Sequence, residues 1–294
     1  MNQIEGSTCV ITGANSGIGK AAATEIARMG ARVVMICRNR ERGKQALLEV
    51  MKDSGSSSVD LILTDLSELQ AVKDLAARLA DEYPQIDVLV NNAGLFRNRR
   101  EVTAQGHEMT FAVNHLAYFT ITLSLLDTLR KSAPCRVINV ASNAHRRMKL
   151  NFEDLQSEKR YNGWKAYGTS KLANILFTYE LARRLEGTGV SANALHPGVV
   201  ATSFGRAGNG LLSAIWKAAS PFMLTPAQGA RTVVHLATSP DVEGISGRYF
   251  ANEKPVPSST ASMDTEAAAR LWSESLSLAG FDEDPLPRRE SVPA

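Results

Sequence analysis

The sequence is poor in cysteine and has no long apolar run. Its three cysteines, Cys9, Cys37 and Cys135, lie far apart without a Cys-x-x-Cys pair. We therefore expect buried thiols in a reducing compartment rather than a disulfide framework. No stretch reaches the ~18 apolar residues of a membrane span. Met1 to Gly6 is polar and leads directly into an apolar strand pattern, so we expect no signal peptide and a cytoplasmic protein.

The chain also has no large excess of positive or negative charge. The 294 residues carry a net charge of +3, and no block of Lys and Arg with interleaved aromatics occurs. This balance gives no indication of nucleic-acid binding. The sequence contains no cluster of His, Cys or Asp residues with the spacing of metal ligands, so we predict no metal site. The length and the 44% hydrophobic content predict one large domain over residues 1–284, followed by a flexible tail at 285–294.

Short apolar runs alternate with helical patterns along most of the chain. Strands are predicted at 8–12, 32–37, 59–64, 86–90, 136–141 and 191–195, and helices at 20–29, 68–82, 105–131 and from 167 onward. Repeated strand–helix units predict an α/β, Rossmann-type, doubly wound parallel sheet with helices on both faces. Ligands bind such sheets beyond the carboxyl ends of the strands.

A glycine-rich turn follows the first predicted strand, with Gly13, Gly17 and Gly19 in the spacing G-x-x-x-G-x-G. Strand, glycine turn and helix together place backbone N–H groups against a phosphate. Gly13 would form the tight turn, and Gly17 and Gly19 would allow a close approach to a pyrophosphate. A G-x-G-x-x-A register beginning at Gly17 is rejected because the strand ends at Thr12. The alternative is an ordinary turn that contains glycines.

The second predicted strand ends in Cys37 and Arg38. A carboxylate about 20 residues after the glycine motif would bind the ribose of NAD, and Cys37 cannot do so. The guanidinium of Arg38 suits a 2′-phosphate. The sequence therefore predicts that NADP(H) is preferred over NAD(H), unless Arg38 belongs to a solvated basic loop.

Tyr167 and Lys171 begin a long amphipathic pattern that continues through Leu172, Ile175 and Leu176. Residues at i and i+4 share a helix face, so the phenol and the ammonium point into the same space. A tyrosine pKa of about 10 is lowered by a nearby cation. Such a pair can transfer a proton to or from a carbonyl/alcohol couple. Taken alone, the pair could equally be two solvent-facing residues.

The order of these motifs resembles the short-chain dehydrogenase/reductase family over nearly the whole chain. The matching residues are Thr12-Gly13-x-x-x-Gly17-x-Gly19, Asp65-Leu66, Asn91-Asn92-Ala93-Gly94, Asn114, Ser142, Tyr167-x-x-x-Lys171 and Pro197-Gly198. Within the family the chain is similar to the retinol dehydrogenase-like branch. That similarity is carried by the runs 12–20, 113–119, 170–177 and 247–250, and by Arg270-Leu271-Trp272.

The resemblance implies a role for each motif residue. Ser142 would hydrogen-bond the substrate oxygen, Tyr167 would transfer the proton, and Lys171 would lower the Tyr167 pKa and hold the nicotinamide ribose. Asn114 would place a water beside Lys171. The implied cofactor-binding residues are Gly13, Asn15, Ser16, Gly17, Ile18, Gly19, Arg38, Asp65, Leu66, Asn92, Ala93, Gly94, Tyr167, Lys171, Pro197, Gly198, Val200 and Thr202. The expected substrate contacts are Ser142, Tyr167, Phe204 and His145, although His145 could equally be a simple loop residue.

Residues 199–230 combine glycines with an apolar stretch, which suits a lid over the substrate. Contact with a membrane surface and a subunit interface remain alternatives, and a homodimer or homotetramer is left open. The predicted function is an NADP(H)-dependent oxidoreductase acting on a small apolar carbonyl or alcohol. A non-catalytic NADP-binding scaffold or redox sensor would need the nucleotide site without Ser142, Tyr167 and Lys171. Sugar-nucleotide epimerases of the extended branch have a turn one residue shorter and a larger substrate domain.

Overall fold

The computed structural model describes residues 4–200 and 223–288. Within these ranges one sheet has the strand order β3-β2-β1-β4-β5-β6-β7-β8. All neighbouring pairs are parallel except β7 with β8. The strands are β1 (Thr8–Thr12), β2 (Arg32–Cys37), β3 (Val59–Leu63), β4 (Val88–Asn91), β5 (Cys135–Val140), β6 (Val190–His196), β7 (Tyr249–Ala251) and β8 (Lys254–Pro255). The predicted doubly wound parallel sheet is confirmed. Its order reverses between β1 and β4, which is where this type of sheet binds ligands.

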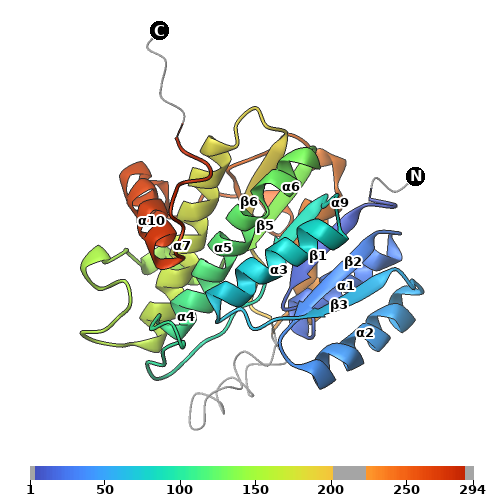
Figure 1. Ribbon diagram of the computed structural model, residues 1–294, viewed down its shortest axis with the longest axis horizontal. Helices are drawn as coiled ribbons and strands as arrows, with labels where there is room; N and C mark the ends of the chain where they lie inside the picture. Colours follow the sequence, from blue (N-terminus) through green and yellow to red (C-terminus); the bar gives the residue numbers. More distant parts are fainter. Residues whose placement is uncertain (1–3, 201–222, 289–294) are drawn as a thin grey trace.

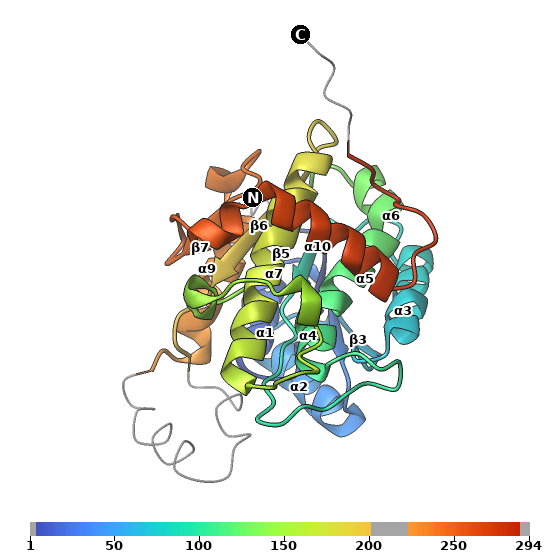
Figure 2. The same cartoon turned by 90° about the vertical axis from the view of Figure 1, so that its left-hand side faces the viewer.

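Helices cover both faces of the sheet (Figure 1). One apolar core joins the sheet to α1 (Gly17–Arg28), α2 (Arg40–Ser54) and α9 (Pro226–Thr238). The other joins it to α3 (Leu69–Glu82), α5 (Ala117–Ser124), α6 (Leu126–Lys131) and α7 (Gly163–Arg184). The last helix, α10 (Thr265–Leu278), packs across α7 on its outer side (Figure 2). The strands are buried on both sides, which explains their nearly continuous apolar sequences.

The single helix predicted over 105–131 is wrong in two respects. It begins at α4 (Met109–Phe111), because the Glu108 carboxylate caps the N–H groups of Thr110 and Phe111 at 2.9 and 2.8 Å. It is then interrupted by a π-helical turn, η1 (Ala112–Leu116), before α5 and α6 continue. Gln105 lies outside the helix, and its side chain instead accepts a hydrogen bond from Leu69 N at the start of α3. Wide π turns are frequent at functional sites, and this one contains Asn114.

The described residues of the predicted tail at 285–294 contact α7. Leu286 is only 2% exposed, and its carbonyl accepts a hydrogen bond from Arg184 Nη1. Arg288 donates to both carboxylate oxygens of Glu180, at 2.6 and 2.9 Å. These contacts fasten the chain to α7 through residue 288, while residues 289–294 lie outside the described range.

The three cysteines are free and buried, as expected from their apolar surroundings. None of the helices in the described ranges has the length and apolar character needed to cross a membrane. The same ranges contain no group of three or more His, Cys, Asp or Glu side chains arranged to hold a metal ion.

Candidate active site

A cleft of about 690 Å³ opens at the carboxyl ends of the central strands. It collects the predicted cofactor residues from distant parts of the chain. Those lining it are Gly13, Asn15, Ser16, Gly17, Ile18, Gly19, Arg38, Asp65, Leu66, Asn92, Ala93, Gly94, Tyr167, Lys171, Pro197, Gly198 and Val200, together with Ser142. Thr202, Phe204 and most of the predicted lid lie outside the described residues.

The glycine turn fits closely against the loop after β4. Gly13 has a φ of +68°, and a Cβ there would lie 2.8 Å from the Ala93 Cα. A Cβ at Gly19 would collide with the Asn92 side chain and the Gly13 carbonyl, so the protein's own packing requires this glycine. The Thr12 hydroxyl ties the two loops together by accepting hydrogen bonds from Asn92 N and Ala93 N, at 2.8 and 3.0 Å.

The turn leaves room and donors for a phosphate. Gly17, the first residue of α1, has a φ of +56°. Ser16 is the N-cap residue of α1, and its side chain accepts no hydrogen bond from the first turn. The N–H groups of that turn therefore lack the side-chain partner that an N-cap residue commonly provides. A helix start of this kind favours an anion. The residues present therefore fit the diphosphate of a dinucleotide.

At the end of β2, Arg38 extends into the mouth of the cleft. Its side chain is 63% exposed, and its Nη1 lies 3.8 Å from the Asp65 carboxylate at the end of β3. Cys37 is 2% exposed, and burial raises the pKa of its thiol to about 11. This end of the cleft thus presents a guanidinium and a buried neutral thiol where NAD recognition would require a carboxylate.

Tyr167 and Ser142 meet on the other side of the cleft. The Ser142 side chain lies close enough to the Tyr167 phenol to lower the phenol's pKa. Burial acts more strongly in the opposite direction and raises the Tyr167 pKa to about 12. At neutral pH the phenol is therefore protonated.

Lys171 lies behind Tyr167 and is 3% exposed. Its Nζ donates to the Val140 carbonyl at 2.8 Å and lies 5.8 Å from the centre of the Tyr167 ring. Burial lowers the Lys171 pKa to about 7. The predicted lowering of the Tyr167 pKa by Lys171 stays a prediction.

Asn114 is fully buried, and its amide group is engaged by protein atoms. Its Nδ2 donates to the Leu95 carbonyl and to Ser170 Oγ, both at 3.0 Å, and its Oδ1 accepts from Leu95 N at 2.8 Å. The π turn thus fastens the loop after β4 to α7. The predicted placement of a water by Asn114 stays a prediction.

His145, for which a substrate contact and a simple loop position were both left open, is not among the residues that line the cleft. Its ring is buried, and Nε2 accepts from Ser259 N at 3.1 Å. Nδ1 therefore carries the proton and donates to the Ser142 carbonyl at 2.6 Å. Burial lowers the His145 pKa, so the ring is neutral. His145 anchors the loop that carries Ser142.

Two aromatic residues at the cleft were not predicted. Phe96 and Trp164 line it, and their ring centres lie 6.2 and 6.3 Å from that of Tyr167. Trp164 precedes Tyr167 by three residues, so helical spacing could have placed it on the same face. Phe96 stands in an irregular loop, and no pattern in the sequence indicated its position.

Comparisons with known proteins agree with this geometry. The family model for short chain dehydrogenases matches residues 7–209. The chain belongs to the short-chain dehydrogenase family. Mouse retinol dehydrogenase 12 is 45% identical over 95% of this chain and 88% of its own length. Human retinol dehydrogenase 14 is 43% identical over 95% of this chain and 88% of its own length. The predicted retinol dehydrogenase-like branch is thereby confirmed.

Solved structures extend the match. An uncharacterized protein from Mycobacterium paratuberculosis superimposes with a TM-score of 0.77 at 32% identity, covering 98% of this chain and 97% of its own. A short chain dehydrogenase from Burkholderia cenocepacia in complex with NADP has a TM-score of 0.68 at 25% identity, covering 85% of this chain and 97% of its own. This short-chain dehydrogenase is therefore an oxidoreductase of CH–OH groups that uses a nicotinamide cofactor.

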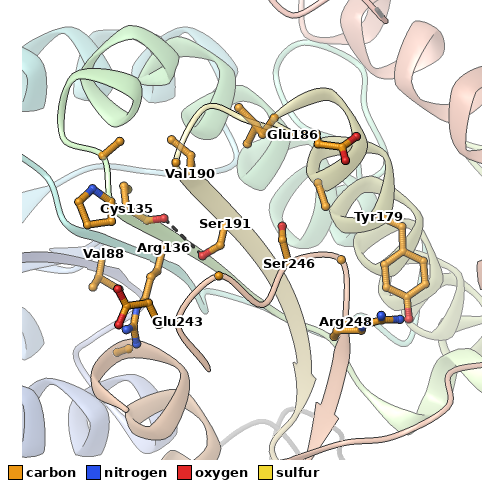
Figure 3. Close-up of a pocket in the computed structure, with 18 of the residues that line it drawn as sticks. Val88, Cys135, Arg136, Tyr179, Glu186, Val190, Ser191, Glu243, Ser246 and Arg248 are labelled. Carbon is orange, nitrogen blue, oxygen red and sulfur yellow. Dashed lines mark hydrogen bonds between the residues drawn. The ribbon is translucent and has the colours of Figure 1, made fainter. Parts of the chain in front are cut away.

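The short-chain dehydrogenase has a second and larger groove, of about 1430 Å³ (Figure 3). It lies at the amino ends of β5 and β6, because Cys135 and Val190, which begin these strands, line it. In Figure 3 the side chains of Tyr179 and Arg248 lie next to each other at one side of the groove. The Ser191 hydroxyl donates to the Cys135 carbonyl at 3.4 Å. None of the predicted site residues that fall within residues 4–200 and 223–288 lines this groove.

Proposed function

We propose that this protein is an NADP(H)-dependent oxidoreductase that interconverts an apolar aldehyde or ketone and its alcohol, with Tyr167 as general acid and base. The meeting of Ser142, Tyr167 and Lys171 in one cleft with the described cofactor residues carries the proposal. The Ser142 and Tyr167 hydroxyls lie in the same cleft as the glycine turn that fits a dinucleotide, and both can hydrogen-bond one substrate oxygen. This is the arrangement that proton transfer to a carbonyl requires.

When bound, the nicotinamide supplies the hydride. Ser142 would hydrogen-bond the carbonyl oxygen and stabilise the charge that develops on it. Tyr167 would give its proton to that oxygen as the alcohol forms. With a Tyr167 pKa of about 12, the phenol already holds at neutral pH the proton that reduction requires. Oxidation would first require the proton to leave Tyr167.

Lys171 would stabilise the phenolate that remains after the transfer. Its ammonium lies 5.8 Å from the ring centre in a buried setting, where a charge acts more strongly than in water. Its pKa of about 7 means that a substantial fraction of Lys171 is charged at neutral pH. A bound anionic cofactor would raise that fraction.

The preference for NADP(H) rests on Arg38 and Cys37. The guanidinium is 63% exposed at the end of β2, where it can form charge-assisted hydrogen bonds to a 2′-phosphate. Cys37 presents no carboxylate that would repel such a phosphate or accept the ribose hydroxyl of NAD. The NADP complexes among the similar solved structures support the same cofactor.

The apolar substrate is supported by the apolar residues of the cleft. Leu95, Phe96, Val113, Trp164 and Val199 line it. Trp164 and Val199 are 51% and 57% exposed, which is unusual for such large apolar side chains. An apolar ligand would cover them.

The test is turnover with purified protein. Aldehydes, ketones and alcohols of increasing chain length are offered with NADPH, NADH or the oxidised cofactors, and absorbance of the reduced nicotinamide is followed. We expect reduction with NADPH, and kcat/KM that rises with apolar chain length. Tight NADPH binding without turnover of any carbonyl would contradict the proposal and favour the scaffold or redox-sensor alternative.

A further inference from the structure

We propose that His115 is a positioning residue for Lys171 and that it acts through the side chain of Asn174. This inference rests on the proposed function, in which Lys171 stabilises the phenolate. The observation behind it is a chain of polar side chains that runs from Ser275 in α10, through His115 in η1, to Asn174 in α7. All three side chains are fully buried, and none of them lines the cleft.

The hydrogen bonds of this chain have a consistent direction. Asn174 Nδ2 donates to the Val140 carbonyl at 3.5 Å, so Oδ1, which lies 3.4 Å from His115 Nδ1, is an acceptor. Nδ1 therefore carries the ring proton, and Nε2 accepts from the Ser275 hydroxyl at 2.9 Å. Burial lowers the His115 pKa to about 3, so the ring is neutral and has a single N–H group. That N–H group holds the Asn174 amide with its nitrogen toward Val140.

The Val140 carbonyl is where this chain reaches the reactive groups. It accepts from Lys171 Nζ at 2.8 Å as well as from the Asn174 amide. A carbonyl oxygen has two lone pairs, so the amide takes one and leaves the other to the ammonium. Val140 also ends β5, shortly before Ser142. The Asn174 amide therefore fixes the direction of Lys171 and the end of the strand that leads to Ser142.

Lys171 depends on this carbonyl because the titratable groups that face it are uncharged. They are the phenols of Tyr167, on the same helix, and of Tyr118 in α5, whose ring centre lies 5.6 Å from Nζ. Burial raises the pKa of both phenols above its usual value. Within residues 4–200 and 223–288, the one hydrogen bond of the ammonium is that to the Val140 carbonyl.

The experiment separates the two hydrogen bonds of the His115 ring. An asparagine side chain can place its amide nitrogen near the position of Nδ1, whereas a glutamine side chain reaches the position of Nε2. His115→Asn therefore keeps a donor to Asn174, and His115→Gln keeps the contact with Ser275. Asn174→Leu has nearly the same shape as the parent side chain and removes the amide from Val140 directly.

The first measurement is the pKa of Lys171 in the cofactor-free protein. It is followed by NMR of isotope-labelled lysines, and the signal is assigned by its absence from Lys171→Met. Without the competing amide, the Val140 carbonyl is left to the ammonium, which favours the charged form. His115→Gln and Asn174→Leu should therefore raise the Lys171 pKa by about one unit, the order of one hydrogen bond. His115→Asn, the conservative variant, should keep the parent value.

The second measurement is kcat with NADPH and the carbonyl substrate that the turnover screen identifies. A misplacement of about 1 Å can cost about 10² in rate, so His115→Gln and Asn174→Leu should lower kcat by about tenfold or more. His115→Asn should restore most of this loss.

Two serines of α10 provide matched controls. Ser275→Ala removes the hydrogen bond that anchors the ring to α10, and it should lower stability in urea without moving the Lys171 pKa. Ser273→Ala, at an exposed position bonded only to its own helix, should change neither quantity.

Two results would overturn the proposal. One is a Lys171 pKa that keeps its parent value in both His115→Gln and Asn174→Leu, and the other is an equal shift in His115→Asn. Either would mean that His115 only packs α10 against η1. Should His115→Gln not fold, Asn174→Leu compared with Ser275→Ala makes the same test. The NMR titration needs no substrate, whereas a failure of the proposed function would appear as absent turnover of every carbonyl by the parent.

Discussion

The cleft and the groove of this molecule differ in the chemistry of their residues more than in their volume. The groove at the amino ends of β5 and β6 is the larger, at about 1430 Å³ against about 690 Å³ for the cleft. Strained glycines occur in both: Gly13 in the cleft is held at positive φ with a Cβ position 2.8 Å from the Ala93 Cα, and Gly189 in the groove is held at positive φ with a Cβ position 2.9 Å from the Ala133 Cβ. The cleft differs because Lys171 is buried there beside Tyr167 with its pKa lowered to about 7. A buried ionisable pair, rather than volume, marks the functional site.

The strongest test of this contrast uses two tyrosines of one helix. Tyr167 faces the cleft and Tyr179 lines the groove, where its hydroxyl lies 2.8 Å from Ser258 Oγ. Because positioned acid–base catalysis contributes about 10²–10⁴-fold, Tyr167→Phe should lower kcat by at least about 10² while cofactor affinity is kept. Tyr179→Phe should cost about 0.5–1.5 kcal/mol of stability, the value of one hydrogen bond, and leave kcat unchanged. Steady-state kinetics and urea unfolding measure both effects, and similar kcat values for the two variants would erase the distinction between the regions.

The second test compares two exposed arginines, Arg38 at the cleft and Arg248 at the groove. Hydrogen bonds to a charged phosphate contribute about 1.5–3 kcal/mol, which corresponds to about 10- to 150-fold in affinity. Arg38→Ala should remove most of the preference for NADPH over NADH with little change in NADH binding. Arg248→Ala should alter neither affinity.

Adding Cys37→Asp to Arg38→Ala should reverse the preference, since the new carboxylate repels phosphate and accepts the ribose hydroxyl. Titrations of both cofactors at one stated salt concentration provide the measurement. Equal affinities of the parent for NADPH and NADH would show that Arg38 does not bind the phosphate.

The smallest expected effect concerns the stability cost of the cleft. The Lys171 pKa is about 7 in the folded protein and 10.5 in its ordinary state. Between these values the unfolded chain binds more protons, so the parent's stability rises with pH across this window. Below pH 7 the buried charge has its full cost. Lys171→Met removes it and should raise the free energy of unfolding at pH 6 by about 1 kcal/mol or more, since one pKa unit corresponds to ~1.4 kcal/mol.

This gain should narrow as the pH approaches 10.5, while activity is lost at every pH. Lys165→Met is the control, because Lys165 is exposed on the same helix. Urea unfolding at pH 6 and pH 9.5 measures the difference in free energy of unfolding between Lys171→Met and the parent, and so tests its sign. A less stable Lys171→Met protein at pH 6 would mean that the ammonium stabilises the fold.

Much of the site followed from the sequence, because the residues that begin and end elements are set by local rules. The glycine turn after β1 and the Tyr167–Lys171 helix were both expected, and the described members of the predicted cofactor set line one cleft. What the sequence left open or got wrong has non-local causes. Two roles were left open for His145; it follows Ser142 closely in the chain, and its Nε2 accepts a hydrogen bond from Ser259 N, 114 residues further on. The break in the predicted helix at 105–131 arises where Asn114 bonds Leu95 and Ser170.

By itself, the sequence determined the kind of chemistry and the kind of fold. Apolar periodicity and glycine spacing act over a few residues, and they specify a doubly wound sheet with a phosphate-binding turn. The tertiary structure alone decided how the reactive groups are tuned. Burial raises the Tyr167 pKa and lowers that of Lys171, and burial depends on segments that are distant in sequence. The close contact between α7 and the loop that carries Phe96 likewise exists only because Gly163 has no side chain. The environment that sets a side chain's pKa is formed by segments that pack together from distant parts of the chain, whereas its local conformation depends mainly on neighbouring residues in the sequence.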